Sequence, residues 1–162
     1  MGQSLAQVYI HIIFGTKYRK PMILHHFEKE LHQFIADQCN QIGCIAIEVG
    51  GSVDHVHILC RLSKSITIPA LLQKIKGSSS KWIKTKYSIL NDFYWQDGYG
   101  AFSVSPIEVD SVCEYIRNQH LHHLSQSYKD EFLGFLDRFE VEYDDQYLWD
   151  NEPSEDLRVI KP

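Results

Sequence analysis

The alternation of hydrophobic and polar positions along the chain predicts four strands and four helices. Short runs rich in β-branched and aromatic residues predict strands at 5–14, 44–50, 53–62 and 101–106. Apolar residues at helical spacing predict helices at 22–43, 65–88, 107–124 and 128–140. Gly43 marks the end of the first helix, and Pro69 falls in the first turn of the second.

The order of these elements predicts the fold class. A β-α-β-β-α-β order is typical of the ferredoxin-like, split β-α-β arrangement of the α+β class. We therefore expect a four-stranded, mainly antiparallel sheet with helices on one face, followed by additional C-terminal helices. The length of 162 residues indicates one domain, assigned to residues 1–150. Residues 151–162 are expected to form a flexible acidic tail.

Composition and cysteine content indicate the class of protein and the cellular compartment to expect. A hydrophobic fraction of 44% is sufficient for a packed core and argues against a disordered chain. No apolar run reaches the length of a membrane span, and the N-terminus lacks the features of a signal peptide. The four cysteines form no C-x-x-C pair, so we expect reduced thiols in a cytoplasmic protein that does not enter a membrane.

Charge is unevenly distributed along the chain. The net charge is −5, but residues 128–162 hold 11 acidic and 4 basic residues. Residues 61–86 hold seven basic residues and no acidic one. A polyanion responds to this local field more than to the global sum. Taken alone, such a run is more often the solvated face of a helix.

Two histidines, separated by a single valine, lie in the predicted strand that contains DHVHIL. Side chains alternate along a strand, so His55 and His57 share one face, while Val56, Ile58 and Cys60 take the other. We expect the histidines on the open face of the sheet, where two imidazoles at this spacing suit one metal ion. By itself, such a pair is more often two ordinary surface or hydrogen-bonded histidines.

A tyrosine and a glutamine are four residues apart in the segment YIRNQHLHH. On a helix, Tyr115 and Gln119 would project from the same face. A glutamine oxygen can complete a site with two histidines, and His122 and His123 are alternative third ligands. A metal at such a site would polarise a phosphoryl oxygen while the tyrosine attacks phosphorus. Considered alone, each residue is more often a packing or surface residue.

Several separated motifs, taken in order, resemble one family. They are DHVHIL, SSSKWIKTKY, YWQDGYGAFSVS, YIRNQHLHH and EYDDQYLW, within residues 5–150. The chain resembles the single-tyrosine HUH transposases of the insertion-sequence 200/605 family, transposase A type. Val53 departs from the pattern, since many relatives have a proline there, but the change removes no functional group.

The resemblance implies a site and a cofactor. In such proteins two histidines and the glutamine hold a Mg²⁺ or Mn²⁺ ion, and the tyrosine is the nucleophile. Carried onto this sequence, the metal ligands are His55, His57 and Gln119, and the catalytic residue is Tyr115.

The resemblance also implies a reaction and partners. The expected enzyme is a metal-dependent DNA transposase that cuts and rejoins single-stranded DNA at hairpin-marked element ends through a 5′-phosphotyrosine intermediate. The expected assembly is a homodimer in which the tyrosine helix of one chain completes the metal site of the other.

Basic and aromatic residues are candidates for DNA contacts. Lysines and an arginine would bind backbone phosphates, and exposed aromatic rings would stack on unpaired bases. The DNA-binding candidates are Lys74, Lys76, Lys81, Lys84, Arg19, Lys20, Trp95 and Tyr99. Aromatic residues at these spacings are more often part of a core.

Other functions stay open at the level of sequence. One is a domesticated relative that acts on repeat hairpins, and another is a non-catalytic module that binds hairpin DNA. A replication initiator or relaxase shares the histidine pair, but relaxases usually place the tyrosine before it, whereas Tyr115 follows it here. A small metal hydrolase is a further possibility.

Overall fold

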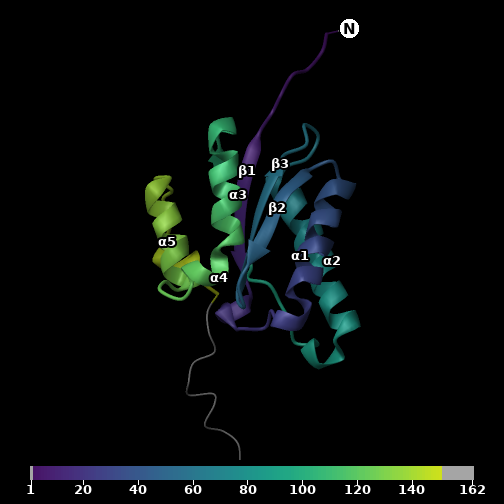
Figure 1. Cartoon of the computed structure of the whole chain (residues 1–162), viewed down its shortest axis with the longest axis vertical. Helices are drawn as coiled ribbons and strands as arrows, with labels where there is room; N and C mark the ends of the chain where they lie inside the picture. The colour runs from purple at the N-terminus through teal and green to yellow at the C-terminus, as the bar shows by residue number, and fades with distance from the viewer. Residues whose placement is uncertain (1, 151–162) are drawn as a thin grey trace, which may run out of the picture.

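The computed structural model describes residues 2–150 and contains the predicted order of elements (Figure 1). The strands are β1 (Tyr9–Gly15), β2 (Ile45–Gly51), β3 (His55–Arg61) and β4 (Gly100–Val104). The longer helices are α1 (His25–Gln41), α2 (Ile68–Lys86), α3 (Val109–Arg117) and α5 (Tyr128–Arg138). Two short helices, α4 (Gln119–His122) and α6 (Asp145–Leu148), complete the C-terminal part of these residues.

The four strands form one antiparallel sheet in the order β2-β3-β1-β4. β3 lies between β1 and β2, which is the split β-α-β arrangement. In the central pair, Ile13 of β1 lies opposite His57 of β3, and Gly15 lies opposite His55. The predicted α+β, ferredoxin-like fold with a four-stranded sheet is confirmed.

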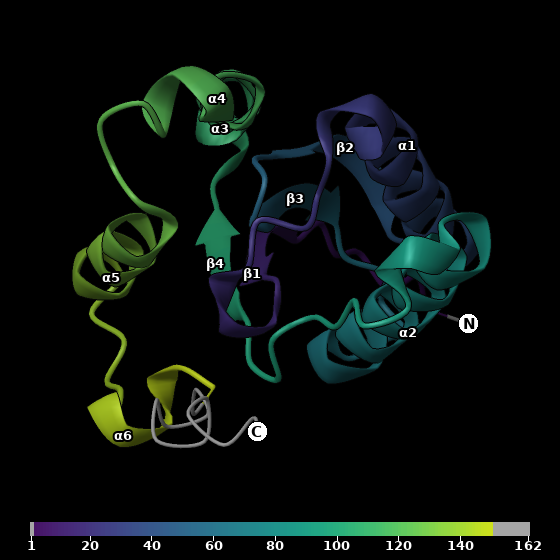
Figure 2. The same ribbon diagram turned by 90° about the horizontal axis from the view of Figure 1, so that it is seen from below.

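Helices cover both faces of the sheet (Figure 2). On one face, α1 and α2 pack over a core that includes Phe14, Val56 and Ile58, so the predicted apolar face of β3 is confirmed. On the other face lie α3 and α5, which contribute Ile116 and Phe132. The histidine face of the sheet is therefore not open, and that expectation was wrong because the C-terminal helices fold back onto it.

Among the differences from the predicted boundaries, two have clear local reasons. Strand β1 begins at Tyr9, which pairs with Arg61 and Val104, the last residues of β3 and β4. Residues 5–8 therefore have no paired residues on either neighbouring strand. The predicted helix at 107–124 is interrupted at Asn118, whose ψ of 18° departs from helical geometry. Asparagine is a poor helix former, and the break redirects the chain before Gln119.

Within the residues that the structure describes, no helix combines the length and the hydropathy needed to span a membrane. The predicted acidic tail at 151–162 lies outside this part of the chain.

Helix α3 approaches strand β2 closely at Gly50. A Cβ atom added to Gly50 would lie 2.8 Å from both the Cγ2 atom and the carbonyl oxygen of Ile116. Such distances are too short for van der Waals contact, so a side chain at this position would push α3 away from the sheet. In contrast, a Cβ atom added to Gly77 in α2 would meet no other atom within 4 Å.

We expect Gly50→Ala to lower the free energy of unfolding by about 1 to 3 kcal/mol, since overpacking a contact displaces backbone. Gly77→Ala is the matched control, and it should stabilise the protein by roughly 0.5 to 1 kcal/mol because alanine favours a helix interior. Urea denaturation of both variants checks this pair. Equal effects of the two substitutions would contradict the close packing of α3 on β2.

Candidate active site

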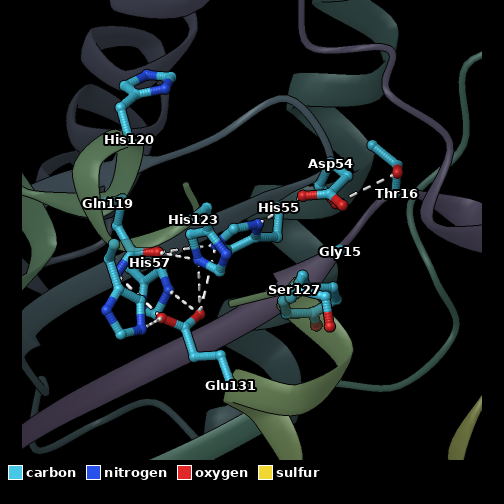
Figure 3. A network of polar contacts seen from close by, with 12 residues as sticks. Gly15, Thr16, Asp54, His55, His57, Gln119, His120, His123, Ser127 and Glu131 are labelled. Atoms are coloured by element: carbon cyan, nitrogen blue, oxygen red, sulfur yellow. Dashed lines mark hydrogen bonds and ion pairs between the residues drawn. The ribbon is translucent and has the colours of Figure 1, made fainter. Parts of the chain in front are cut away.

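His55 and His57 lie beneath the C-terminal helices, and both side chains are fully buried. Strand β3 directs them to one face of the sheet, as the alternation predicted. A buried imidazole requires polar partners. Figure 3 shows Asp54, Gln119 of α4 and Glu131 of α5 around the two rings, and His11 of β1 is a further partner.

Each of these two histidines has a partner at both ring nitrogens. His55 Nδ1 lies 2.7 Å from Asp54 Oδ1, and His55 Nε2 lies 2.9 Å from Gln119 Oε1. His57 Nδ1 lies 2.7 Å from His11 Nε2 on strand β1, and its Nε2 atom faces Glu131. The two rings are therefore fixed in orientation by residues outside the histidine pair.

Glu131 of α5 brings a carboxylate into this group of imidazoles (Figure 3). Its Oε1 atom lies 2.9 Å from His57 Nε2, 3.4 Å from His55 Nε2 and 3.3 Å from His123 Nε2. The candidate ligand atoms of His55, His57, His123 and Glu131 all lie within 4.8 Å of one another. Three imidazoles and one carboxylate form a donor set that suits a divalent transition metal.

The electrostatics of this cluster are set by burial and by the carboxylate. Burial lowers the pKa of His55, but the hydrogen bonds with Asp54 and Glu131 outweigh it and raise the pKa to about 9. Burial lowers the pKa of His57 to about 4, and Glu131 offsets this only in part. Burial raises the pKa of Glu131, but hydrogen bonds from His123, His55 and His57 hold it well below its usual range.

These protonation states affect how a cation would bind. Glu131 is ionised at pH 7 and offers lone pairs, whereas neutral His57 donates its Nε2 proton to Glu131 and must give up that proton to bind a cation there. A cation that binds His55 must displace its proton, so metal binding should release protons.

Tyr115 of α3 reaches the same carboxylate. Its hydroxyl group donates a hydrogen bond to Glu131 Oε2 and lies 3.3 Å from His122 Nε2. Burial raises the pKa of Tyr115, and the hydrogen bond to Glu131 raises it further. The phenol is therefore protonated in this arrangement, and a nearby cation or base is needed to form the phenolate.

The structure brings together all four residues that the sequence predicted as catalytic or metal-binding. His55, His57 and Gln119 are in contact or adjacent, and Tyr115 approaches them through Glu131. Gln119 also donates from Nε2 to Glu131 Oε2 at 3.1 Å.

Sequence reasoning missed several residues of the cluster. It did not identify Glu131, His11 or Asp54, although Asp54 hydrogen-bonds to His55. One signal was present: Glu131 falls between Tyr128 and Phe132 in the buried stripe of α5, where a carboxylate is rare without partners. His123 was weighed only as an alternative ligand.

The predicted DNA-binding residues fall into two groups. Lys74 and Lys81 are exposed on α2, and the exposed ring of Tyr99 lies beside that helix. Lys84 places its Nζ atom 3.8 Å from the ring centroid of Tyr94. These side chains are accessible to a polyanion.

Two of the predicted DNA contacts are contradicted by their surroundings. Trp95 is 6% exposed and its Nε1 atom donates to Ser79 Oγ at 2.9 Å, so no face of its ring is free to stack on a base. Lys76 donates from Nζ to the backbone carbonyl oxygens of Gln96, Asp97 and Gly98, and burial lowers its pKa to about 8. Both residues hold the loop before β4 rather than present a DNA-binding surface.

Arg19 and Lys20 lie at the turn that follows β1. Tyr18 and Arg19 have φ values of 58° and 55°, in the left-handed region that non-glycine residues rarely adopt. The Arg19 guanidinium lies 4.7 Å from the ring centroid of Trp149. Beside this turn is a pocket of about 320 Å³ with an aromatic and basic lining, formed by Lys17, Tyr18, Lys20, Met22, Asp92 and Tyr94.

Comparison with known families and proteins gives consistent results. The family model described as "Transposase IS200 like" matches residues 4–119. The ISDra2 transposase TnpA of Deinococcus radiodurans is 26% identical over 119 residues, which cover 70% of this chain and 85% of that protein. The transposase for insertion sequence element IS200 of Salmonella typhimurium is 22% identical over 114 residues. These residues cover 67% of this chain and 74% of that protein.

Solved structures share the fold. A Deinococcus radiodurans R1 protein described as a transposase has a TM-score of 0.61 and 23% identity, covering 74% of this chain and 96% of that one. A REP-associated tyrosine transposase bound to a REP hairpin has a TM-score of 0.54 and 13% identity. The match covers 76% of this chain and 74% of that one. Residues His122, His123 and Glu131 lie beyond the end of the family match.

The pKa of His55 provides a test of the cluster. Because its folded value of about 9 lies above the unfolded value, the stabilisation from protonated His55 is complete below about pH 6.5 and is lost as the pH rises toward 9. We expect Asp54→Asn to lower the pKa of His55 by about 1 to 2 pH units, since the carboxylate partner is removed.

Nitrogen-detected NMR of the imidazole rings between pH 5 and 10 measures this change. The control is Asp110→Asn, an exposed position in the first turn of α3 that does not contact His55. A His55 titration that is the same in the wild type and in Asp54→Asn would contradict the assigned hydrogen bond.

Proposed function

The chain belongs to the IS200-like transposase family, an enzyme family that acts on DNA, and from this we propose a specific reaction. In this proposal, the protein cuts and rejoins single-stranded DNA at hairpin-marked element ends through a 5′-phosphotyrosine intermediate. The observation that carries the proposal is the contact of the Tyr115 hydroxyl group with Glu131 of the His-rich cluster.

The cluster supplies the groups that this chemistry needs. When bound, a Mg²⁺ or Mn²⁺ ion held by His55, His57 and an oxygen ligand would supply Lewis-acid polarisation of the scissile phosphate. Gln119 was the predicted oxygen ligand, and Glu131 offers a second, ionised one within the same cluster. His123 is the alternative nitrogen ligand. Magnesium and manganese favour oxygen ligands, which supports Gln119 and Glu131 over His123.

The nucleophilic step starts at Tyr115. Its phenol oxygen forms a bond to phosphorus, and the bond from phosphorus to the 3′ oxygen breaks, which leaves a free 3′-hydroxyl group. Glu131 orients the phenol through its hydrogen bond, but its lowered pKa makes it a weak base. His122 Nε2, 3.3 Å from the hydroxyl oxygen, is a second acceptor for the phenolic proton. The ester conserves the bond energy, so a second 3′ end can attack it without ATP.

Several features support a hairpin DNA partner. The structural neighbour with a TM-score of 0.54 is described as bound to a REP hairpin. In this chain, Lys20 and Tyr94 line the pocket beside the turn after β1, and Lys84 lies over Tyr94. Basic groups next to exposed aromatic rings suit a phosphate backbone with unpaired bases.

The predicted homodimer with a tyrosine supplied in trans stays a prediction. The contact of Tyr115 with Glu131 occurs within one chain, so the geometry does not require a second copy. A domesticated relative that acts on repeat hairpins is the second candidate function. The likeness to a REP-bound transposase favours it over a replication initiator and over a small metal hydrolase.

We expect Tyr115→Phe to abolish covalent adducts between the protein and single-stranded DNA, a loss of at least about a hundredfold, because the nucleophile is removed. Single-stranded DNA from the flanks of the gene is incubated with Mn²⁺, and adducts are counted on a denaturing gel. Tyr147→Phe, an exposed tyrosine on α6, is the control and should form adducts as the wild type does. Chelation of the metal should also abolish the adduct. If Tyr115→Phe cleaves single-stranded DNA as the wild type does, Tyr115 is not the nucleophile.

We expect Lys20→Ala to weaken binding to hairpin-forming single-stranded DNA and to reduce the slope of log affinity against log salt by about 1, because one phosphate contact is lost. The backbone carbonyl of Lys20 accepts a hydrogen bond from Thr16 Oγ1, and alanine keeps this contact, so the fold should be retained. Lys129→Ala on α5 removes an exposed charge on a different element and should leave the slope unchanged. Fluorescence anisotropy at several salt concentrations measures both, and identical slopes would rule out this surface.

A further inference from the structure

His11 on strand β1 is a buried histidine to which the proposed reaction assigns no role. Its side chain belongs to a residue that is 2% exposed. His11 lies opposite Leu59 of β3, two positions from His57. Side chains at this diagonal offset on one face of a sheet are near enough to meet. The His11 Nε2 atom accordingly lies 2.7 Å from His57 Nδ1.

Two aromatic neighbours hold the His11 ring in its orientation. The ring centroid of His11 lies 5.2 Å from that of Phe135 at an interplanar angle of 85°, and 6.4 Å from that of Tyr115 at 75°. Both are edge-to-face contacts, a favoured arrangement of aromatic rings. The Nε2 atom of His11 therefore stays directed at His57, beside the proposed nucleophile.

The protons on the two rings follow from their partners. His57 Nε2 donates to the Glu131 carboxylate, so the Nδ1 atom of a neutral His57 carries a lone pair. His11 Nε2 is then the donor of the hydrogen bond between the rings. Burial lowers the pKa of His11 well below its usual range, so this ring is neutral at pH 7 and carries one N–H group.

A cation at His57 Nε2 would reverse the direction of this hydrogen bond. A neutral imidazole that offers its Nε2 lone pair carries its proton on Nδ1. A buried N–H group needs an acceptor. The acceptor at hydrogen-bond distance from His57 Nδ1 is His11 Nε2.

We infer that His11 is a positioning residue for cation binding at His57, because it accepts the Nδ1 proton of that ring. The inference rests on the proposed function, since it takes His57 as a ligand of the divalent ion. Asp54 has the equivalent place beside His55, with its Oδ1 atom 2.7 Å from His55 Nδ1. Such outer partners set the tautomer and the orientation of metal-binding histidines.

The exchange leaves the number of protons on the two rings unchanged. His57 Nε2 releases one proton to solvent, the proton between the rings moves from His11 Nε2 to His57 Nδ1, and His11 Nδ1 takes up one proton from solvent. Both imidazoles stay neutral. A carboxylate in place of His11 would add a buried negative charge near Glu131, whereas a neutral imidazole nitrogen can donate or accept.

The test uses the full chain and two substitutions at residue 11. His11→Leu removes the polar atoms and keeps an apolar side chain beside Phe135. His11→Gln is the conservative variant, because its amide group can donate or accept near the position of Nε2. The control is His25→Leu on α1, where the histidine side chain is 96% exposed. Circular dichroism verifies that each variant is folded.

Mn²⁺ affinity is measured by electron paramagnetic resonance of the unbound ion, and His57→Gln, which removes the ligand itself, identifies the signal of this site. We expect His11→Leu to weaken Mn²⁺ binding about 10- to 100-fold, the usual effect of losing such a partner. His11→Gln should recover most of the affinity, and His25→Leu should bind as the wild type does.

Nitrogen-detected NMR locates the proton between the rings in the wild type. We expect this proton on His11 Nε2 without Mg²⁺ and on His57 Nδ1 with Mg²⁺ bound. A contribution of His11 to packing alone would not move the proton.

Three results overturn the inference while leaving the proposed metal site intact. They are Mn²⁺ binding by His11→Leu that equals that of the wild type, equally weak binding by His11→Gln and His11→Leu, and a proton that stays on His11 when Mg²⁺ binds. If the wild type and His57→Gln bind Mn²⁺ alike, His57 is not a ligand, and the proposed metal site fails together with the inference.

Discussion

The burial of the Glu131 carboxylate is the constraint on which this site depends. A buried charge is strongly unfavourable unless it is paired and hydrogen-bonded. Here its partners come from four parts of the chain: His57 from β3, Tyr115 from α3, Gln119 from α4 and His123 from the residues that follow α4. Satisfying one carboxylate therefore places Tyr115, the proposed nucleophile, and the candidate metal ligands together. Removing it would leave several polar groups in the interior without their shared acceptor.

Strand β3 contributes side chains to both faces of the sheet because successive side chains point to opposite faces. Val56 and Ile58 pack beneath α1 and α2, while His55 and His57 face α4 and α5. A slip of one residue in the pairing with β1 would place imidazoles in the hydrocarbon core. The apolar positions thus secure the register on which the chemistry of the opposite face relies.

The strand and helix pattern, and the pairing of histidines on one face, could be predicted from sequence because they depend on local periodicity. The C-terminal helices could be found, but not their position over the histidine face, because that depends on contacts between distant segments. Glu131 was missed for the same reason, since His55 and His57 of β3, which it faces, are far away in the sequence. Trp95 was misjudged because its place in a polar loop does not determine whether its ring enters the core or faces solvent.

The complete burial of both histidine rings has a consequence for catalysis. In the proposed reaction, rings without exposed surface cannot meet a phosphodiester directly, so substrate entry would require displacement of part of the helical cover above them. The connection at 123–127 joins α4 to α5 next to the cluster and ends at an exposed N-cap, Ser127. If this connection opened, the rate of the proposed cleavage would depend on the free energy of local unfolding. That free energy is the cost of opening the site and is separate from the barrier of the chemical step.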